Sequence, residues 1–457
     1  MPTLDGAICE ADWFGYNRGM RAHCGIIRGV LRPLLWVTRR WGLLFLLVLA
    51  ALALRYEGPP LGRLETQVGR ELVSRRFNFP AWETRAFLVK VMHGLVAPQR
   101  YMTETARRDF VVNYLHLVSE IGQLESEIRR AYTDPAVEEP DAATILLRTR
   151  LAELRATQQD RQPLAEAILE EQVSSVLSQA GFGQLGQHIP PVASHFTPLP
   201  LLLVVSPRDR IENVYSRSLE HGLDAAEMES VEERVESVAD VSSLVTPIGG
   251  MAAYPAMLLE TSSIDFVTTV AAHEWTHHYL TFRPLGWNYD ASGDARTINE
   301  TVASIVGKEI GLAVLVRYYP EFAPAVPAPD DAGVPAEPAP PSEPPVFDFR
   351  AEMRQTRVQV DALLAQGQIK QAEAYMEERR KVFVANGYAI RKLNQAYFAF
   401  HGAYADEPGA AGEDRIGPMV NALRAASPNL HTFVSQIAGI TTRTELEALL
   451  AEGQADT

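Results

Sequence analysis

The segment His273-Glu274-Trp275-Thr276-His277 combines two histidines and a glutamate at a spacing that suits metal chemistry. In a helix, His273 and His277 are four residues apart and present both imidazoles on one face. That spacing suits two corners of a tetrahedral zinc site. Glu274 projects beside them, where its carboxylate could take a proton from a water molecule on the metal. The segment therefore predicts a centre for metal-assisted hydrolysis.

The two histidines also share the apolar face of their helix. Phe266, Val270 and Leu280 continue the same face with 4-3-4-3 spacing. Two satisfied core histidines are the plain alternative to a site. However, the polar nitrogens of two imidazoles on one buried helix face are difficult to pair unless they share a partner. A metal ion supplies that partner.

A third protein ligand is expected from the next helix. The sequence Asn299-Glu300-Thr301-Val302-Ala303 opens that helix, with 22 residues between His277 and Glu300. The alternative is a capping box, in which Glu300 would only bond the backbone N–H of Thr297.

The face of this helix that carries Glu300 favours the ligand role. Ser304, Gly307 and Gly311 follow Glu300 on that face with 4-3-4 spacing. Small residues let two helices approach closely. The helix from Thr297 could therefore lie against the histidine face with Glu300 at the metal.

HEWTH followed by NETVA resembles the gluzincin zinc metallopeptidases, the group that includes thermolysin and aminopeptidase N. The resemblance covers roughly residues 242–318. It implies a zinc ion held by His273, His277 and Glu300. It also implies that Glu274 is the general base, which passes the proton to the leaving amine. The metzincin type is excluded, because the second motif histidine is followed by HYLTFR and not by the required glycine and histidine.

The resemblance also implies an edge strand and a donor for the transition state. Residues 249–259 are suitably placed for a peptide substrate to add as an extra strand. Such sites usually contain a tyrosine or histidine that donates to the oxyanion. The candidates are Tyr289, Tyr397, His401 and Tyr404. His278 faces away from the seam and is not expected to be a ligand, and Glu309 is expected to be a solvated helix charge.

The elements that position these residues are mainly helical. Helices are predicted over 263–281 and 297–318, and residues 350–400 are again helical. The apolar seam over 110–128, the break at 132–140 and a second seam over 147–154 predict a helical hairpin or bundle. Strands are predicted over 200–205, 242–246 and 251–259, and Pro247 and Pro255 assign that region to a sheet edge.

The expected fold is therefore mainly α (α+β), with a small edge-stranded sheet beside the HExxH helix and helical domains before and after. Between residues 320 and 345, ten of 26 residues are proline, which predicts a linker or insertion. The predicted domains are a basic segment 1–40, an anchor or signal region 41–56, a helical hairpin domain 57–190, a metallopeptidase core 191–319, a Pro/Ala-rich segment 320–346 and a C-terminal helical domain 347–457.

Charge and cysteine content exclude several classes of protein. The net charge is −15 over 457 residues, and the first 56 residues carry +4, so the remainder carries −19. A nucleic-acid partner is not expected, because phosphate binding needs a basic surface. The two cysteines, Cys9 and Cys24, exclude a disulfide scaffold and a thiolate zinc finger.

The N-terminal region predicts attachment to a membrane. Trp41 to Leu54 is a run of fourteen uncharged residues after Arg39-Arg40. It is short for a spanning helix, which needs about 20 residues. The expectation is a single-pass anchor with the catalytic domain extracytoplasmic, and the alternative is secretion after cleavage of a signal peptide. The true start is Met1 or Met20.

The expected function is a membrane-associated zinc metallopeptidase that acts on a peptide or protein. One alternative is a non-catalytic extracytoplasmic scaffold or sensor, but scaffolding does not require the Glu274 carboxylate. A second alternative is a metal hydrolase that does not cleave peptides. The sequence does not decide between exo- and endopeptidase, nor does it indicate the oligomeric state.

Overall fold

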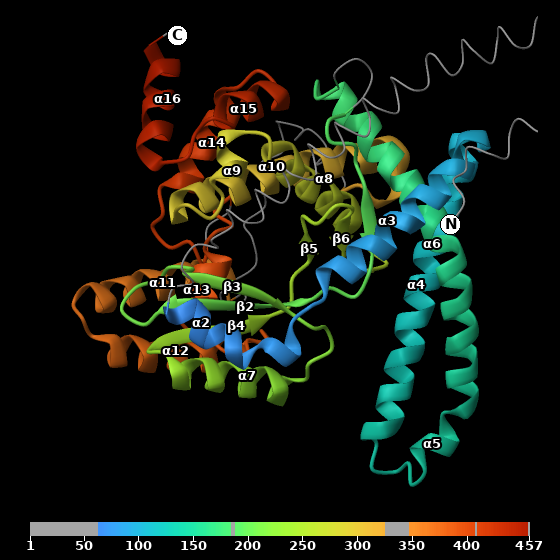
Figure 1. Cartoon of the computed structure of the whole chain (residues 1–457), viewed down its shortest axis with the longest axis horizontal. Coiled ribbons are helices and arrows are strands. Elements are labelled where there is room, and N and C mark those ends of the chain that lie inside the picture. The colour runs from blue at the N-terminus through green and yellow to red at the C-terminus, as the bar shows by residue number, and fades with distance from the viewer. Residues whose placement is uncertain (1–62, 184–187, 325–346, 407–408, 456–457) are drawn as a thin grey trace, which may run out of the picture. The chain divides into compact units, whose positions relative to one another are not determined.

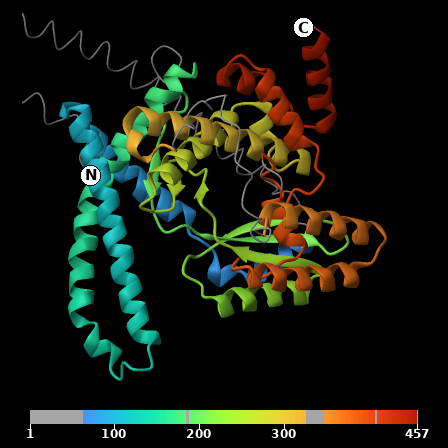
Figure 2. The same cartoon turned by 180° about the vertical axis from the view of Figure 1, so that it is seen from behind.

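The computed structural model describes residues 63–183, 188–324, 347–406 and 409–455. The chain divides into two compact units, Met1–Thr66 and Gln67–Thr457. Among the described elements, the second unit contains the strands and the helices except for the start of α2 (Arg63–Glu71). Figures 1 and 2 show a mainly α-helical architecture with small sheets, which confirms the predicted fold class.

A long antiparallel helical hairpin precedes the sheets. It consists of α4 (Glu104–Thr133) and α6 (Ile145–Gln179), joined through the short α5 (Pro140–Ala143). The two long helices lie side by side in Figures 1 and 2. Leu117, Ile121 and Leu154 are buried between them. The predicted hairpin is confirmed.

Within the described residues, six short strands form two three-stranded sheets. In the first, β1 (Ser194–Phe196) is parallel to β6 (Ala256–Leu258), and β6 is antiparallel to β5 (Gly250–Met251). In the second, β2 (Leu201–Pro207) lies between β3 (Tyr215–Leu219) and β4 (Val241–Thr246), and both pairings are antiparallel. The single strand predicted over 251–259 is therefore two strands, and β5 forms the edge of its sheet.

Carboxylates from helix α6 close the outer edge of β1. Glu170 accepts the backbone N–H of Ser194 at 2.7 Å, and Glu166 accepts that of Phe196 at 2.8 Å. Residues i and i+4 of a helix are about 6 Å apart along its axis, and residues j and j+2 of a strand are about 6.8 Å apart, so the two spacings match. Lys90 neutralises both carboxylates at 2.6 and 2.7 Å.

The second sheet is closed in the same way by α7 (Ala225–Val238). Glu232 accepts the N–H of Val245 at 2.6 Å, and Glu236 accepts that of Ser243 at 3.1 Å. Lys392 pairs with both carboxylates. Because β1 and β4 are both covered in this way, neither edge is open to another strand.

The helices α8 (Ile264–Leu280) and α10 (Gly293–Tyr318) form the centre of the fold, with the short α9 (Pro284–Trp287) between them. Glycine allows their close approach. A Cβ at Gly307 would lie 2.8 Å from the Thr269 carbonyl oxygen and 3.1 Å from Cβ of His273. A Cβ at Gly311 would lie 2.9 Å from Cα of Thr269. The predicted contact between the small-residue stripe and the histidine helix is confirmed.

Helix α10 begins four residues before its predicted start. Its N-cap is Ser292, whose Oγ accepts the N–H of Ala295 at 3.1 Å. Thr297 is therefore inside the helix, where its own N–H no longer belongs to the cap. This position excludes the capping-box alternative for Glu300.

The C-terminal part contains two groups of helices. The pair α11 (Phe349–Ala365) and α12 (Ile369–Ala385) has its own apolar core, and α13 (Gln395–His401) packs on β2 and β4. The helices α14 (Ile416–Ala426), α15 (Leu430–Ile437) and α16 (Arg443–Ala455) complete the core around α10.

In the N-terminal part, α3 (Phe79–Val96) packs against α6. The boundaries of the predicted domains remain predictions.

The prediction of a single-pass membrane protein is corrected by the structure. No helix within the described ranges is both long and apolar enough to cross a membrane. The long helices α4 and α6 carry charged side chains throughout, and hydrocarbon excludes such groups. The predicted segments 1–40 and 41–56 lie outside the described residues, as does most of 320–346. The membrane prediction is not retained.

Replacing Gly307 with alanine tests the packing of α8 on α10. The added methyl group would press on Thr269 and His273, so we expect a loss of about 1–3 kcal/mol in unfolding free energy. Gly122→Ala in α4 is the matched control, because nothing lies within 4 Å of its Cβ position. That control should gain about 0.5–1 kcal/mol. Urea unfolding followed by circular dichroism measures both, and a gain in Gly307→Ala would contradict the packing.

Candidate metal centre

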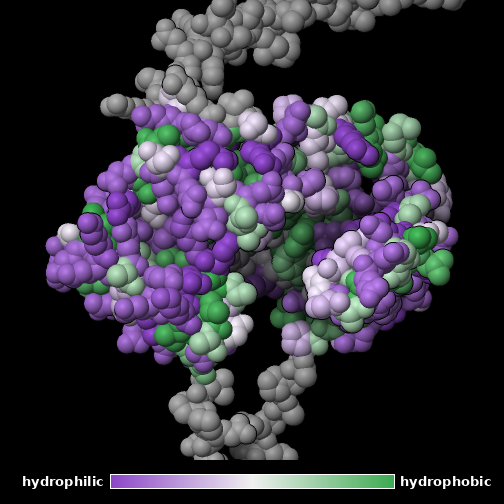
Figure 3. Space-filling model, turned by 90° about the horizontal axis from the view of Figure 1, so that it is seen from below, coloured by the Kyte–Doolittle hydropathy of each residue, from purple (hydrophilic) through white to green (hydrophobic). Residues whose placement is uncertain are grey.

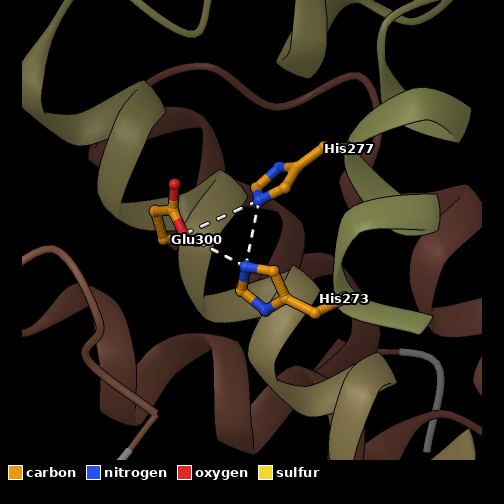
Figure 4. Close-up of side chains that lie close together, drawn as sticks. All are labelled: His273, His277 and Glu300. Atoms are coloured by element: carbon orange, nitrogen blue, oxygen red, sulfur yellow. Dashed lines mark hydrogen bonds and ion pairs between the residues drawn. The ribbon is translucent and has the colours of Figure 1, made fainter. Parts of the chain in front are cut away.

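Three side chains from α8 and α10 point toward one another in Figure 4. Nε2 of His273 lies 3.1 Å from Nε2 of His277. Oε2 of Glu300 lies 3.5 Å from the first nitrogen and 3.7 Å from the second. The structure therefore brings together all three of the residues that the sequence proposed as ligands, and this group could hold a metal ion.

The face of α8 that carries the histidines lies toward a cavity rather than in the core. The core face of α8 carries Ile264, Val267 and Trp275, which are buried. The side chains of His273 and His277 keep 15% and 12% of their surface exposed. They are therefore accessible to a small ligand, whereas core histidines would not be.

Asn299 orients one of the histidines, a role that the sequence analysis did not assign. Its Oδ1 lies 2.7 Å from Nδ1 of His277, and its Nδ2 donates to the Leu285 carbonyl at 3.3 Å. When Nδ1–H donates to Asn299, Nε2 of His277 keeps its lone pair toward Glu300. The position of Asn299, directly before Glu300 in the sequence, was the available signal.

The carboxylate of Glu300 is held in its charged form. Its Oε1 accepts the hydroxyl of Tyr289, whereas its Oε2 is buried and has no hydrogen-bond partner among the described residues. Burial alone would raise the pKa of Glu300, but His277 and His273 outweigh burial and lower it to about 2. A buried carboxylate oxygen without a donor is costly, and it faces the two imidazoles.

The two imidazoles differ in the direction of their pKa shifts. Burial lowers the pKa of His277 to about 4, despite the attraction of Glu300. Burial would also lower the pKa of His273, but the neighbouring carboxylates of Glu300 and Glu274 raise it. The pKa values of the two imidazoles are therefore shifted in opposite directions, and a metal cation would compete with protons for both rings.

Glu274 lies beside this group but is not part of it. Its side chain is buried, and burial raises its pKa to about 7. A Cβ at Gly250 would overlap Oε1 of Glu274, so only glycine lets β5 pass this close. A carboxyl group with this pKa can both accept and donate a proton near neutral pH.

A cavity of about 670 Å³ contains the whole constellation. Its walls are α8, α10, the segment 247–252 that includes β5, and the residues at the end of α13. Figure 3 shows a largely hydrophilic surface that is hollowed in the middle, with hydrophobic residues along the hollow.

Three of the four candidate donors line this cavity. Tyr289, His401 and Tyr404 do so, but Tyr397 does not. Tyr397 faces a neighbouring cavity, and its ring lies 4.2 Å from that of His401. The ring of Tyr404 stacks on His273 with a centroid distance of 6.2 Å. The structure thus removes Tyr397 from the set.

Two further residues of the motif region have structural contacts. Nε2 of His278 lies 2.7 Å from the Ala253 carbonyl, so it holds the loop after β5 and faces away from the metal group. Glu309 makes a bidentate pair with Arg424 of α14 at 2.7 and 2.8 Å. Glu309 is therefore a link between helices.

Comparison with known proteins gives no relative: no family model, curated protein or solved structure matches this chain.

Asn299→Ala should weaken the binding of a divalent metal. Without the hydrogen bond to Nδ1, the ring of His277 can rotate, and a loss of about 10–100-fold in affinity is typical. Co²⁺ titration followed by visible absorption measures it. Thr297→Ala, also in α10, is the control and should bind Co²⁺ like the wild type. Equal affinity for the Asn299 variant would show that this amide does not orient the ligand.

Proposed function

We propose that the protein is a zinc-dependent peptidase similar to the gluzincins. The observation that carries the proposal is the convergence of His273, His277 and Glu300, with Glu274 in the same cavity. Three neutral or anionic donors beside a carboxyl group of raised pKa have a clear use in hydrolysis. Neither a scaffold nor a sensor requires this combination.

The donor set fits zinc better than other common ions. Zinc takes two imidazole nitrogens and one carboxylate oxygen at about 2.0–2.2 Å, and tetrahedral donors at that length are about 3.3 Å apart. The three observed separations are 3.1, 3.5 and 3.7 Å. The partnerless Oε2 of Glu300 supplies the third donor. When bound, zinc supplies Lewis-acid activation of a water molecule and of the scissile carbonyl.

Glu274 moves the proton in this proposal. Its carboxylate takes a proton from the attacking water and returns it to the leaving amine nitrogen. A pKa of about 7 suits both transfers, because the optimal acid or base titrates near the working pH. Its place beside Gly250 restricts where the scissile bond must lie.

The β5 strand positions the substrate. The Leu259 N–H bonds the Gly249 carbonyl, so in the register of β5 with β6 the pair Gly250–Leu258 is not hydrogen-bonded. The N–H and C=O of Gly250 therefore point to the outer edge, which lines the cavity. A peptide that adds as a strand there bonds Gly250 next to the Glu274 carboxylate.

Tyr404 is the donor that we favour for the oxyanion. The hydroxyl of Tyr289 already donates to Glu300. Tyr404 stacks on His273 and keeps 37% of its surface exposed. Burial and the nearby carboxylates of Glu300 and Glu274 raise the pKa of Tyr404, so its hydroxyl stays protonated and can donate to a substrate oxygen.

Glu274→Gln tests the proposal most directly. We expect one zinc per chain in the wild type and in this variant, but no peptide hydrolysis in the variant, because the amide cannot take the proton. His277→Ala should lose both zinc and activity. Elemental analysis and a peptide-library assay measure the two properties. Hydrolysis by Glu274→Gln at a rate within several-fold of wild type would rule out this base.

Tyr404→Phe should lower kcat by about 10²-fold with little change in KM, because the lost hydrogen bond forms mainly in the transition state. Zinc content should not change. Tyr101→Phe is the control, since Tyr101 is 89% exposed and lies outside the cavity. An unchanged kcat for Tyr404→Phe would assign the oxyanion to another donor.

A further inference from the structure

Two smaller cavities share lining residues with the cavity at the metal group, and we call the three together the cleft. One, of about 380 Å³, shares Glu300 and Tyr289 with the central cavity and extends to Arg296 and β3. The other, of about 400 Å³, shares Ser304 and extends to Phe349 of α11.

The three cavities follow one another along α10. Arg296 lines only the first, Glu300 lines the first and the central one, and Ser304 and Lys308 line the central one and the third. Twelve residues of helix from Arg296 to Lys308 span about 18 Å. An extended peptide rises about 3.3 Å per residue, so about five residues fit along this length. The metal group lies between the two ends.

Two of the charged groups at the ends of this cleft are held in ion pairs, and Arg217 at the β3 end donates to the hydroxyl of Tyr215. Arg296 pairs with Asp290 at 2.6 Å, and Lys308 pairs with Asp406 at 2.7 Å. In the described lining of the central cavity, the carboxylates are Glu274 and Glu300, and both have roles in the chemistry. The cleft thus extends past the metal group in both directions, and Arg296 and Lys308 at its ends are each paired with a carboxylate.

We propose that the substrate is an internal segment of an extended polypeptide, so that the protein is an endopeptidase. This inference rests on the proposed function and names its substrate class. A chain that crosses the whole cleft occupies both outer cavities and pairs with the backbone of β5 at its middle. Backbone pairing at Gly250 is independent of side-chain identity. A free terminus is not needed for binding.

The test compares one peptide of about ten residues in four forms, a length that exceeds the cleft. The forms are unmodified, N-acetylated, C-amidated and modified at both ends. The full chain, loaded with zinc, is assayed by mass spectrometry, with Glu274→Gln as the blank. We expect internal cleavage of all four forms, with kcat/KM within about threefold of one another.

The outcomes separate the two proposals. Stepwise release of terminal residues from the unmodified peptide, with the doubly modified form intact, would overturn the endopeptidase inference and leave the peptidase proposal standing. Cleavage of no form, or equal cleavage by Glu274→Gln, would overturn both.

A variant at the junction of two cavities provides an independent readout. Ser304→Leu narrows the passage from the metal group toward α11, so kcat/KM for the doubly modified peptide should fall by about tenfold with zinc content unchanged. Ser435→Leu, at an exposed position of α15, is the matched control and should match the wild type. An unchanged kcat/KM for Ser304→Leu would contradict a substrate that extends past this point.

Discussion

The close approach of α8 and α10 is the constraint on which the rest of the site depends. His273 and His277 come from one helix and Glu300 from the other. The distance between their donor atoms therefore depends on how closely the two helix backbones approach. Gly307 and Gly311 face Thr269 at distances that leave no room for a side chain. Packing in protein interiors is dense and does not yield by whole ångströms. The glycines therefore determine whether the three donor atoms can share one ligand.

The strand next to the site depends on a second constraint, which acts at the far edges of the sheets. Carboxylates of α6 and α7 accept the outward N–H groups of β1 and β4. Because of these bonds, the edges of β1 and β4 cannot pair with another strand. Of the other two edges, β3 forms a bridge with Arg76, whereas the edge of β5 is brought against Glu274 at Gly250. A substrate strand that pairs with the free edge of β5 would therefore lie beside the Glu274 carboxyl group, whose pKa is raised.

The features that sequence predicted well are those encoded locally. The histidine helix was expected at 263–281 and lies at Ile264–Leu280. The edge closures could not be predicted, because Glu166 and Phe196 are 30 residues apart and side-chain to backbone pairing leaves no periodic pattern. The cap at Ser292 was missed for a related reason. A serine before a glycine is also a common turn, and only the packing of α10 decides between the two.

The aromatic donor is a part of the site that could not be predicted from the sequence. Tyr397, His401 and Tyr404 are close in sequence, and helical periodicity alone does not indicate which one faces a site on other helices. That choice depends on how α13 packs on β2 and β4, and this sheet is fixed in turn by α7. Tyr404 follows the end of α13, at a point where the chain no longer packs on the sheet, and its ring can therefore contact His273. One wall of the cleft is formed by the residues at the end of α13, which packs on the second sheet, and the opposite wall is formed by α8 and α10. The packing of the second sheet relative to α8 and α10 therefore sets the width of the cleft that is available to a substrate.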